Sequence, residues 1–168
     1  MRWWGVVALL VAASCGGADE ELPRLDLIGE AVTAVVADTG SDPALFEVLA
    51  DREGVTVTVA ETEIDMDSGD VTGLFARSYR FEGGELAEPT KPVRAEGAVF
   101  AASAVPSLDA AVASGVRDAL DDPTIVDLAI SGAPDGAVVI DLTVISDMGG
   151  RILVLVRPDG TVLGVQAD

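Results

Sequence analysis

The sequence predicts an α+β fold made of two tandem repeats, each a single helix followed by a four-stranded antiparallel sheet. Three observations predict this fold class. The two halves of the chain resemble each other at a spacing of about 80 residues. Each half opens with apolar residues at helical intervals, and each continues with short β-rich runs separated by proline and glycine turns.

The first half begins with a predicted helix at residues 23–38, because apolar residues recur at helical spacing between Leu25 and Val36. Pro43 follows, and proline stops the continuation of a helix. The strict alternation in Val55–Val59 then indicates a strand with one apolar face. The four strands of this half are expected at residues 44–50, 55–62, 72–81 and 85–88.

The second half repeats this order. An apolar residue at every fourth position from Leu108 to Leu120 predicts a helix at residues 107–121, and Pro123 follows it. The Asp159-Gly160 pair between two β-rich runs predicts a tight turn. The four strands of this half are expected at residues 124–131, 137–146, 151–157 and 161–166.

These elements divide the chain into a first repeat at 23–88, a linker at 89–106 and a second repeat at 107–168. Three prolines mark the linker, in which Gly97–Phe100 is a candidate extra edge strand. A half of about 65 residues is marginally stable alone. We therefore expect the two halves to pack together, either sheet edge to sheet edge or face to face.

The N-terminus has the pattern of a secretory signal peptide, which we place at residues 1–14. Met1-Arg2 gives a positive start, and Trp3–Ala13 is an uninterrupted run of apolar residues and glycine. This run is far shorter than the roughly 20 residues that a helix needs to cross a bilayer.

The small residues Ala12, Ala13 and Ser14 are followed at once by Cys15, the only cysteine of the chain. This stretch resembles the lipobox of bacterial lipoproteins, although leucine is usual where Ala12 stands. The resemblance implies cleavage before Cys15, acylation of its thiol and anchoring to the outer face of the cell membrane. Residues 15–22 would then be a flexible tether.

The C-terminal part, roughly residues 107–166, resembles a PepSY-like repeat, and residues 25–88 do so more faintly. The matching residues are Val154–Val156 and the turn Pro158-Asp159-Gly160-Thr161-Val162-Leu163. The whole layout also resembles small lipoproteins with tandem repeats, including β-lactamase-inhibitor-like folds. This resemblance implies a binding or inhibitory module outside the cytoplasm.

The composition excludes several classes of function. Without residues 1–14 the side chains sum to about −20, from 9 basic and 29 acidic residues, which argues against nucleic acid as a partner. The chain has no histidine, so it lacks the commonest general base and metal ligand. We expect no cofactor. The excess of acids indicates either an acidic or saline setting or attraction to basic partners or cations.

The densest acidic cluster contains Asp65, Asp67 and Asp70, with Gly69 among them. Alternating carboxylates in such a loop are weak candidates for a calcium site. The EF-hand pattern is not met, because Ala76 stands where its bidentate glutamate belongs. A solvated hairpin loop is the simpler interpretation.

The sequence therefore predicts a non-enzymatic binding or inhibitory module that is anchored through Cys15. Its partner would be another envelope protein or a small ligand. Two alternatives stay open at this point. One is a carboxylate-dependent hydrolase acting on cell-envelope material, and the other is a cation-stabilised structural protein.

Overall fold

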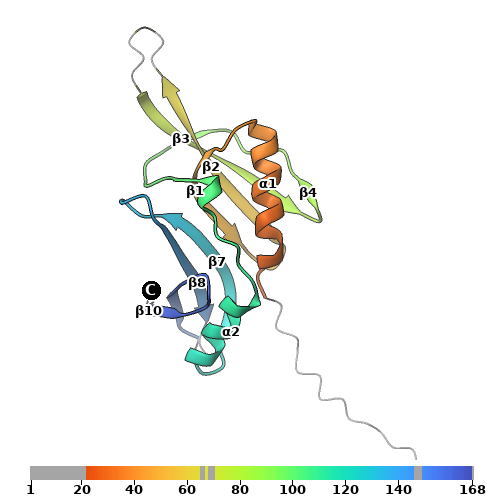
Figure 1. Ribbon diagram of the computed structural model, residues 1–168, viewed down its shortest axis with the longest axis vertical. Coiled ribbons are helices and arrows are strands. Elements are labelled where there is room, and N and C mark those ends of the chain that lie inside the picture. The colour runs from red at the N-terminus through yellow and green to blue at the C-terminus, as the bar shows by residue number, and fades with distance from the viewer. Residues whose placement is uncertain (1–21, 65–66, 68–70, 146–148, 168) are drawn as a thin grey trace, which may run out of the picture.

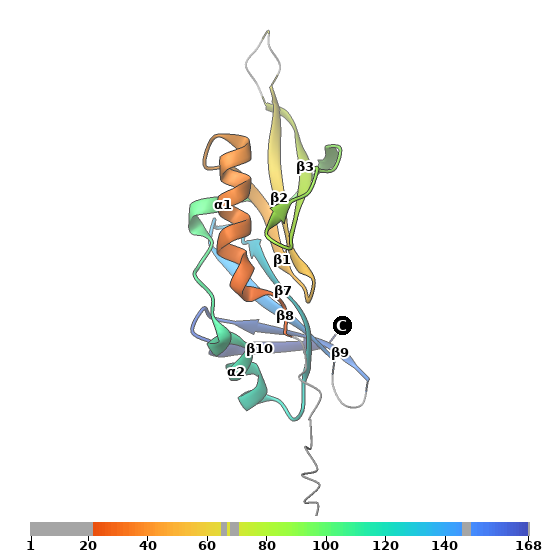
Figure 2. The same ribbon diagram turned by 90° about the vertical axis from the view of Figure 1, so that its right-hand side faces the viewer.

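The computed structural model describes residues 22–64, 67, 71–145 and 149–167. In this part of the chain, ten strands form one antiparallel sheet, ordered β10-β9-β8-β7-β1-β2-β3-β4. The short strands β5 and β6 pair with β3 and β1. Both helices lie on the same side of the sheet (Figures 1 and 2).

The two helices are α1 (Ile28–Thr39) and α2 (Ala110–Ala119), and short 3-10 turns stand at Leu25–Leu27 and Ala102–Ala104. The strands are β1 (Ala44–Ala50), β2 (Gly54–Ile64), β3 (Val71–Glu82), β4 (Glu85–Leu86), β5 (Val93–Ala95), β6 (Phe100–Ala101), β7 (Thr124–Gly132), β8 (Val138–Ile145), β9 (Arg151–Val156) and β10 (Val162–Ala167).

The predicted fold class, two tandem repeats of one helix plus a four-stranded antiparallel sheet, is wrong, because the strands of the described residues form a single ten-stranded sheet. β1 and β7 pair antiparallel, Val48 opposite Ile130 and Ala50 opposite Leu128, so the strands of both halves belong to one continuous sheet. In separate sheets β1 and β7 would each leave a row of backbone groups unpaired. Their pairing satisfies these groups and buries the joint.

The segment expected to be a linker also contributes to this sheet. Arg94 of β5 lies opposite Phe75 of β3, and Phe100 of β6 lies opposite Leu45 of β1. Phe100 is buried, and its ring belongs to the same hydrophobic core as the strands. The chain between β4 and α2 is therefore held on the body of the molecule at two places.

The helices are shorter than the predicted ranges, because a 3-10 turn at Leu25–Leu27 precedes α1 and a capping residue sets the start of α2. α2 begins at Ala110, since the carboxylate of Asp109 accepts a hydrogen bond from the backbone N–H of Ala111 at 2.7 Å. α1 ends before Gly40, whose φ of 71° is the left-handed conformation typical of a helix C-cap. Within the described residues, neither helix is long and apolar enough to span a membrane.

The core lies between the helices and one face of the sheet. Val55, Val57 and Val59 of β2 point toward α1, where Ala31 and Val35 are buried against them. The same cluster continues through β7, β8 and β9 to α2. One continuous apolar core thus holds both helices on one side of the sheet, and no helix of the described residues lies on the opposite side (Figure 2).

Candidate functional site

The side of the sheet that faces away from α1 and α2 is the first candidate surface, and we call it the open face. Its residues follow from the register, because directly opposed residues of antiparallel strands share a face. On β1 and β2, Glu47 lies opposite Thr58, and Glu47 also lies opposite Ser131 of β7. Asp141 of β8 lies opposite Ala129 of β7. All these residues except Ala129 are partly exposed.

Two register shifts change which side chains point to this face. One lies in β1 between Leu45 and Glu47, and the other lies in β7 between Ile125 and Asp127. At such a bulge two residues of one strand oppose a single residue of its partner, and the usual alternation is offset by one position. The carboxylates of Glu47 and Asp127 consequently stand on the open face, while Leu45 and Ile125 stay in the core.

Three carboxylates on neighbouring strands, Glu47, Asp127 and Asp141, form the acidic centre of the open face. Burial raises the pKa of Glu47 above its usual value, and the charges of Asp141 and Asp127 raise it further. Burial and the charge of Asp127 likewise raise the pKa of Asp141. Arg151 reaches Asp127 at 3.7 Å. Ionisation of all three carboxylates therefore lowers the free energy of unfolding.

Asp141→Asn should therefore stabilise the protein at neutral pH, by roughly 0.5 kcal/mol, the size of one like-charge contact on a sheet. The sign follows from the raised pKa. The folded state binds a proton at Asp141 more readily than the unfolded state, so ionisation at neutral pH opposes folding. Urea unfolding at pH 7 measures the gain, with Glu96→Gln, at an exposed glutamate, as the control. A loss of stability in Asp141→Asn would contradict this account.

Beside the acidic centre, Arg80 of β3 is held by Asp51, which follows β1. The guanidinium donates to both carboxylate oxygens of Asp51, at 2.7 and 2.8 Å, and to the hydroxyl of Thr56 at 3.2 Å. Asp51 also accepts the backbone N–H groups of Glu53 and Gly54. Chiefly because of Arg80, the pKa of Asp51 is lowered to about 2. This pair fixes the β1–β2 turn against β3.

Low pH should reduce the free energy of unfolding through the Arg80–Asp51 pair. A carboxylate with a depressed pKa contributes stability above its unfolded value of 3.8, and the contribution is lost as pH falls toward about 2. Since 35% of the Asp51 side chain is exposed, solvent screening reduces the contribution to about 1 kcal/mol. Urea unfolding at pH 5 and pH 2.5 should show Asp51→Asn losing less stability across this interval than the wild type. Equal pH dependence in the two proteins would exclude this role for Asp51.

A hollow of about 500 Å³ lies next to the Arg80–Asp51 pair. Asp51, Arg52 and Glu53 form one wall, and Thr124, Val126 and Ile145 form the other. Ile145 is 40% exposed. One wall of the hollow is therefore charged, and the other carries the apolar side chains of Val126 and Ile145. Such a hollow suits a long basic side chain, whose stem is apolar and whose head is charged.

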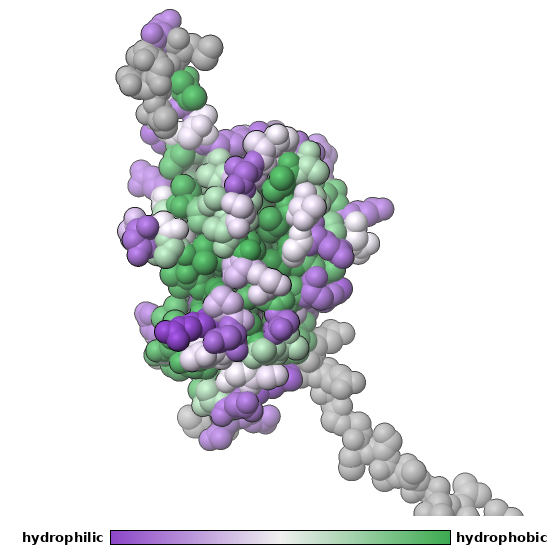
Figure 3. Space-filling view, in the orientation of Figure 1, coloured by the Kyte–Doolittle hydropathy of each residue, from purple (hydrophilic) through white to green (hydrophobic). Residues whose placement is uncertain are grey.

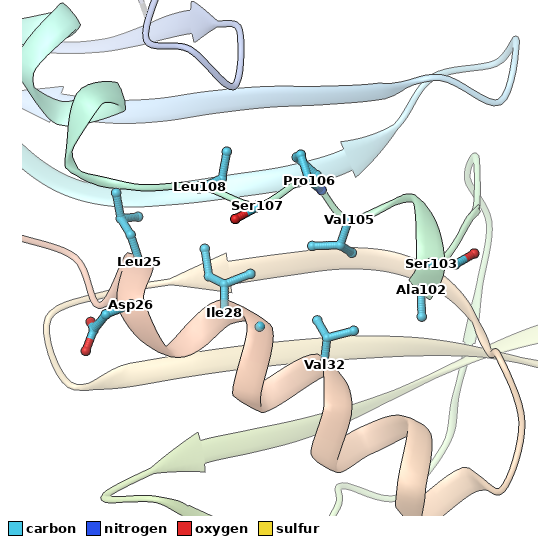
Figure 4. Close-up of a pocket in the computed structure, with 11 residues that line it drawn as sticks. Leu25, Asp26, Ile28, Val32, Ala102, Ser103, Val105, Pro106, Ser107 and Leu108 are labelled. Carbon is cyan, nitrogen blue, oxygen red and sulfur yellow. The ribbon is translucent and has the colours of Figure 1, made fainter.

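A second candidate surface is an apolar groove on the helix-bearing side, between α1 and the segment that leads to α2. Leu25, Ile28 and Val32 line it from one side, and Val105 and Leu108 line it from the other (Figure 4). Its volume is about 390 Å³. Hydrophobic side chains reach the surface across this side of the molecule (Figure 3). The polar residues of its lining are Asp26, Ser103 and Ser107.

The candidate site residues predicted from the sequence are not among the described residues of the open face or of the apolar groove. Cys15, Asp65 and Asp70 lie outside the described residues, so acylation and the loop's affinity for calcium stay predictions. Asp67 is exposed. Among the described residues no group of three or more histidine, cysteine or acidic side chains is placed to hold a metal ion.

The sequence interpretation missed the acidic centre, although a signal for it exists. Glu47 interrupts the run Ala44–Leu49, and Asp141 interrupts Val138–Ile145, so each is a single acid inside a strand that is otherwise largely apolar. A charged group is rarely kept in such a place without a function or a partner. Comparisons of the chain with protein-family models, with curated proteins and with solved structures find no match.

Proposed function

We propose that the protein is a membrane-anchored extracytoplasmic lipoprotein that acts as a non-enzymatic binding module. In this proposal the open face binds a partner protein of the cell envelope through basic residues of that partner. The observation that carries it is the acidic centre: Glu47, Asp127 and Asp141 stand together on the side of the sheet opposite the described helices α1 and α2.

The anchor rests on the first fifteen residues. The short apolar run Trp3–Ala13, the small residues before Cys15 and the acidic stretch Asp19–Glu21 after it favour cleavage, acylation and a solvated tether. Bound in this way, the folded body would stand away from the lipid surface. Its net charge favours the same arrangement, because anionic head groups repel it.

Charge complementarity supports a partner with basic side chains. Arg151 approaches Asp127 at 3.7 Å, and more than half of that arginine side chain is exposed. A lysine or arginine brought by a docking protein would neutralise charges that repel one another in the free protein. The hollow beside Val126 and Ile145 would take the apolar stem of such a side chain.

Binding is favoured over hydrolysis by the shape of the surroundings. A carboxylate pair that cleaves a glycosidic bond works in a cleft that holds the substrate between the two groups. Neither the apolar groove beside α1, nor the hollow beside the Arg80–Asp51 pair, nor a third hollow beside β10 is lined by Glu47, Asp127 or Asp141. The acidic centre lies instead on a broad sheet surface, the kind of surface that suits a macromolecule.

Site-directed photocrosslinking in the cell that makes the protein tests the docking surface. A photoreactive residue replaces Ser131, which lies opposite Glu47 on the open face, and in a second protein it replaces the exposed Ser114 of α2. We expect one envelope protein to be captured from position 131 and not from position 114. Capture of the same protein from both positions, or from neither, would contradict the proposal.

A matched pair of triple variants tests the role of charge. The first carries Glu47→Gln, Asp127→Asn and Asp141→Asn. The second removes the same charge from exposed acids of the helix-bearing side, with Glu30→Gln, Asp118→Asn and Asp121→Asn. Capture from position 131 should fall at least tenfold in the first variant and stay unchanged in the second, since a single desolvated charge pair is worth over 1.4 kcal/mol. Equal capture by both variants would remove the acidic centre from the proposal.

The anchor has its own test. Mass spectrometry of the mature N-terminus should find an acylated Cys15 as the first residue. A chain that keeps residues 1–14 and a free thiol would overturn the anchor while leaving the docking surface to be judged by crosslinking.

A further inference from the structure

The two edges of the sheet differ in how they are protected. Beyond β3, one edge ends in β4 and β5, which are only two and three residues long. Pro89, Lys91, Pro92 and Arg94 stand along this edge. Short strands, prolines and charged side chains are the usual means by which a protein prevents its sheet edge from pairing with another chain.

The other edge is β10, which has none of these protections. It spans six residues, Val162–Ala167, without a charge or a proline. In the described part of the chain it pairs with β9 alone. A bulge between Val162 and Gly164 disturbs its start, whereas Gly164–Ala167 pair with β9 without a register shift. Every second residue of such an edge strand directs its backbone N–H and C=O groups away from the sheet.

The side chains of β10 are as open as its backbone. Leu163 is 57% exposed and Val165 is 51% exposed. Beside Leu163 lies an apolar hollow of about 270 Å³ whose walls include Val139 and Leu155. A neighbouring strand would therefore gain both backbone hydrogen bonds and apolar contacts at this edge.

We propose that β10 is a dimerisation edge, at which β10 of a second copy of this chain pairs antiparallel and extends the sheet across a twofold axis. An antiparallel pair of identical strands is self-complementary. If residue i of one copy contacts residue j of the other, residue j of the first copy also contacts residue i of the second. The net charge of −19 opposes most contacts between two copies, but no charged residue lies between Gly160 and Ala167. The uncharged edge is where this repulsion is least.

This inference does not depend on the binding function proposed above. β10 is separated from β7 by β8 and β9, so the joined edges lie away from Glu47 and Asp127. A dimer formed in this way would leave both open faces accessible. It would also place the two acidic centres on one extended sheet.

Sedimentation equilibrium of the full chain in density-matched detergent tests the dimer. We compare the wild type with Val165→Lys and with the matched control Val93→Lys, which replaces a 61% exposed valine at the protected edge. The wild type and Val93→Lys should reach twice the mass of one chain as concentration rises. Val165→Lys should stay monomeric, because it gives β10 the kind of charged side chain that prevents a sheet edge from pairing.

Amide hydrogen exchange is a second measurement, and it shows whether β10 is the place where the two copies meet. Amides of Gly164–Ala167 should become more protected with concentration in the wild type and in Val93→Lys, and not in Val165→Lys. Thermal unfolding confirms that both lysine variants are folded. A wild type that is monomeric at every concentration, or a Val165→Lys variant that dimerises as the wild type does, would overturn the proposal.

Discussion

Gly115→Ala is expected to destabilise the protein by about 3 kcal/mol, although the same change in an exposed helix normally stabilises by up to 1 kcal/mol. Gly115 lies in the middle of α2, and a Cβ atom there would overlap the backbone carbonyl of Gly160 in the β9–β10 turn. Backbone atoms cannot rotate away as a side chain can. α2 would have to move off the sheet, which would expose Val112 and Val116.

The contact is reciprocal, since a Cβ atom at Gly160 would overlap the carbonyl of Ala111. Gly160 has a φ of 84°, which side chains rarely adopt, so Gly160→Ala should cost at least as much. Gly29→Ala in α1 is the control, because nothing lies within 4 Å of a Cβ atom there. Urea unfolding should show a small gain for Gly29→Ala. An equal gain for Gly115→Ala would mean that α2 is not packed on this turn.

Local patterns in the sequence predicted the positions of these elements better than the way the elements are joined. The alternation Val55–Val59 lies within β2, and the Asp159-Gly160 turn lies between β9 and β10. Such signals belong to neighbouring residues and can be read directly. The pairing of β1 with β7 joins residues about 80 positions apart, and no local pattern records which strand edge meets which. The error in the predicted fold class therefore lies in strand pairing.

The acidic centre shows the same limit at the level of single residues. The sequence shows Glu47 and Asp141 as acids within apolar strands. The three carboxylates of the acidic centre, however, come from the three strands β1, β7 and β8. The register shift before Glu47 also breaks the alternation that would have assigned its face. Only the joined sheet brings these carboxylates to one surface. Both the fold and the candidate site depend on the pairing of strands that are far apart in the sequence. Local sequence patterns do not reveal this pairing.

Leu128→Ala should reduce the free energy of unfolding by about 3 kcal/mol, within the range for a buried leucine whose removal leaves a cavity. Leu128 is fully buried in β7, opposite Ala50 of β1 and Leu142 of β8, so its side chain sits at the joint between the two halves. The same substitution at Leu163, which is 57% exposed, should cost far less and is the control.

The distribution of this loss distinguishes one cooperative sheet from two units. Because a single core cluster runs from α1 through β7 to α2, opening at the joint should destabilise the whole described body together. Native-state hydrogen exchange should then report the same loss for the most protected amides of β2 and of β8. If β8 alone lost protection while β2 kept it, the two halves would unfold separately. In that case the β1–β7 pairing would hold the halves side by side without coupling their stability.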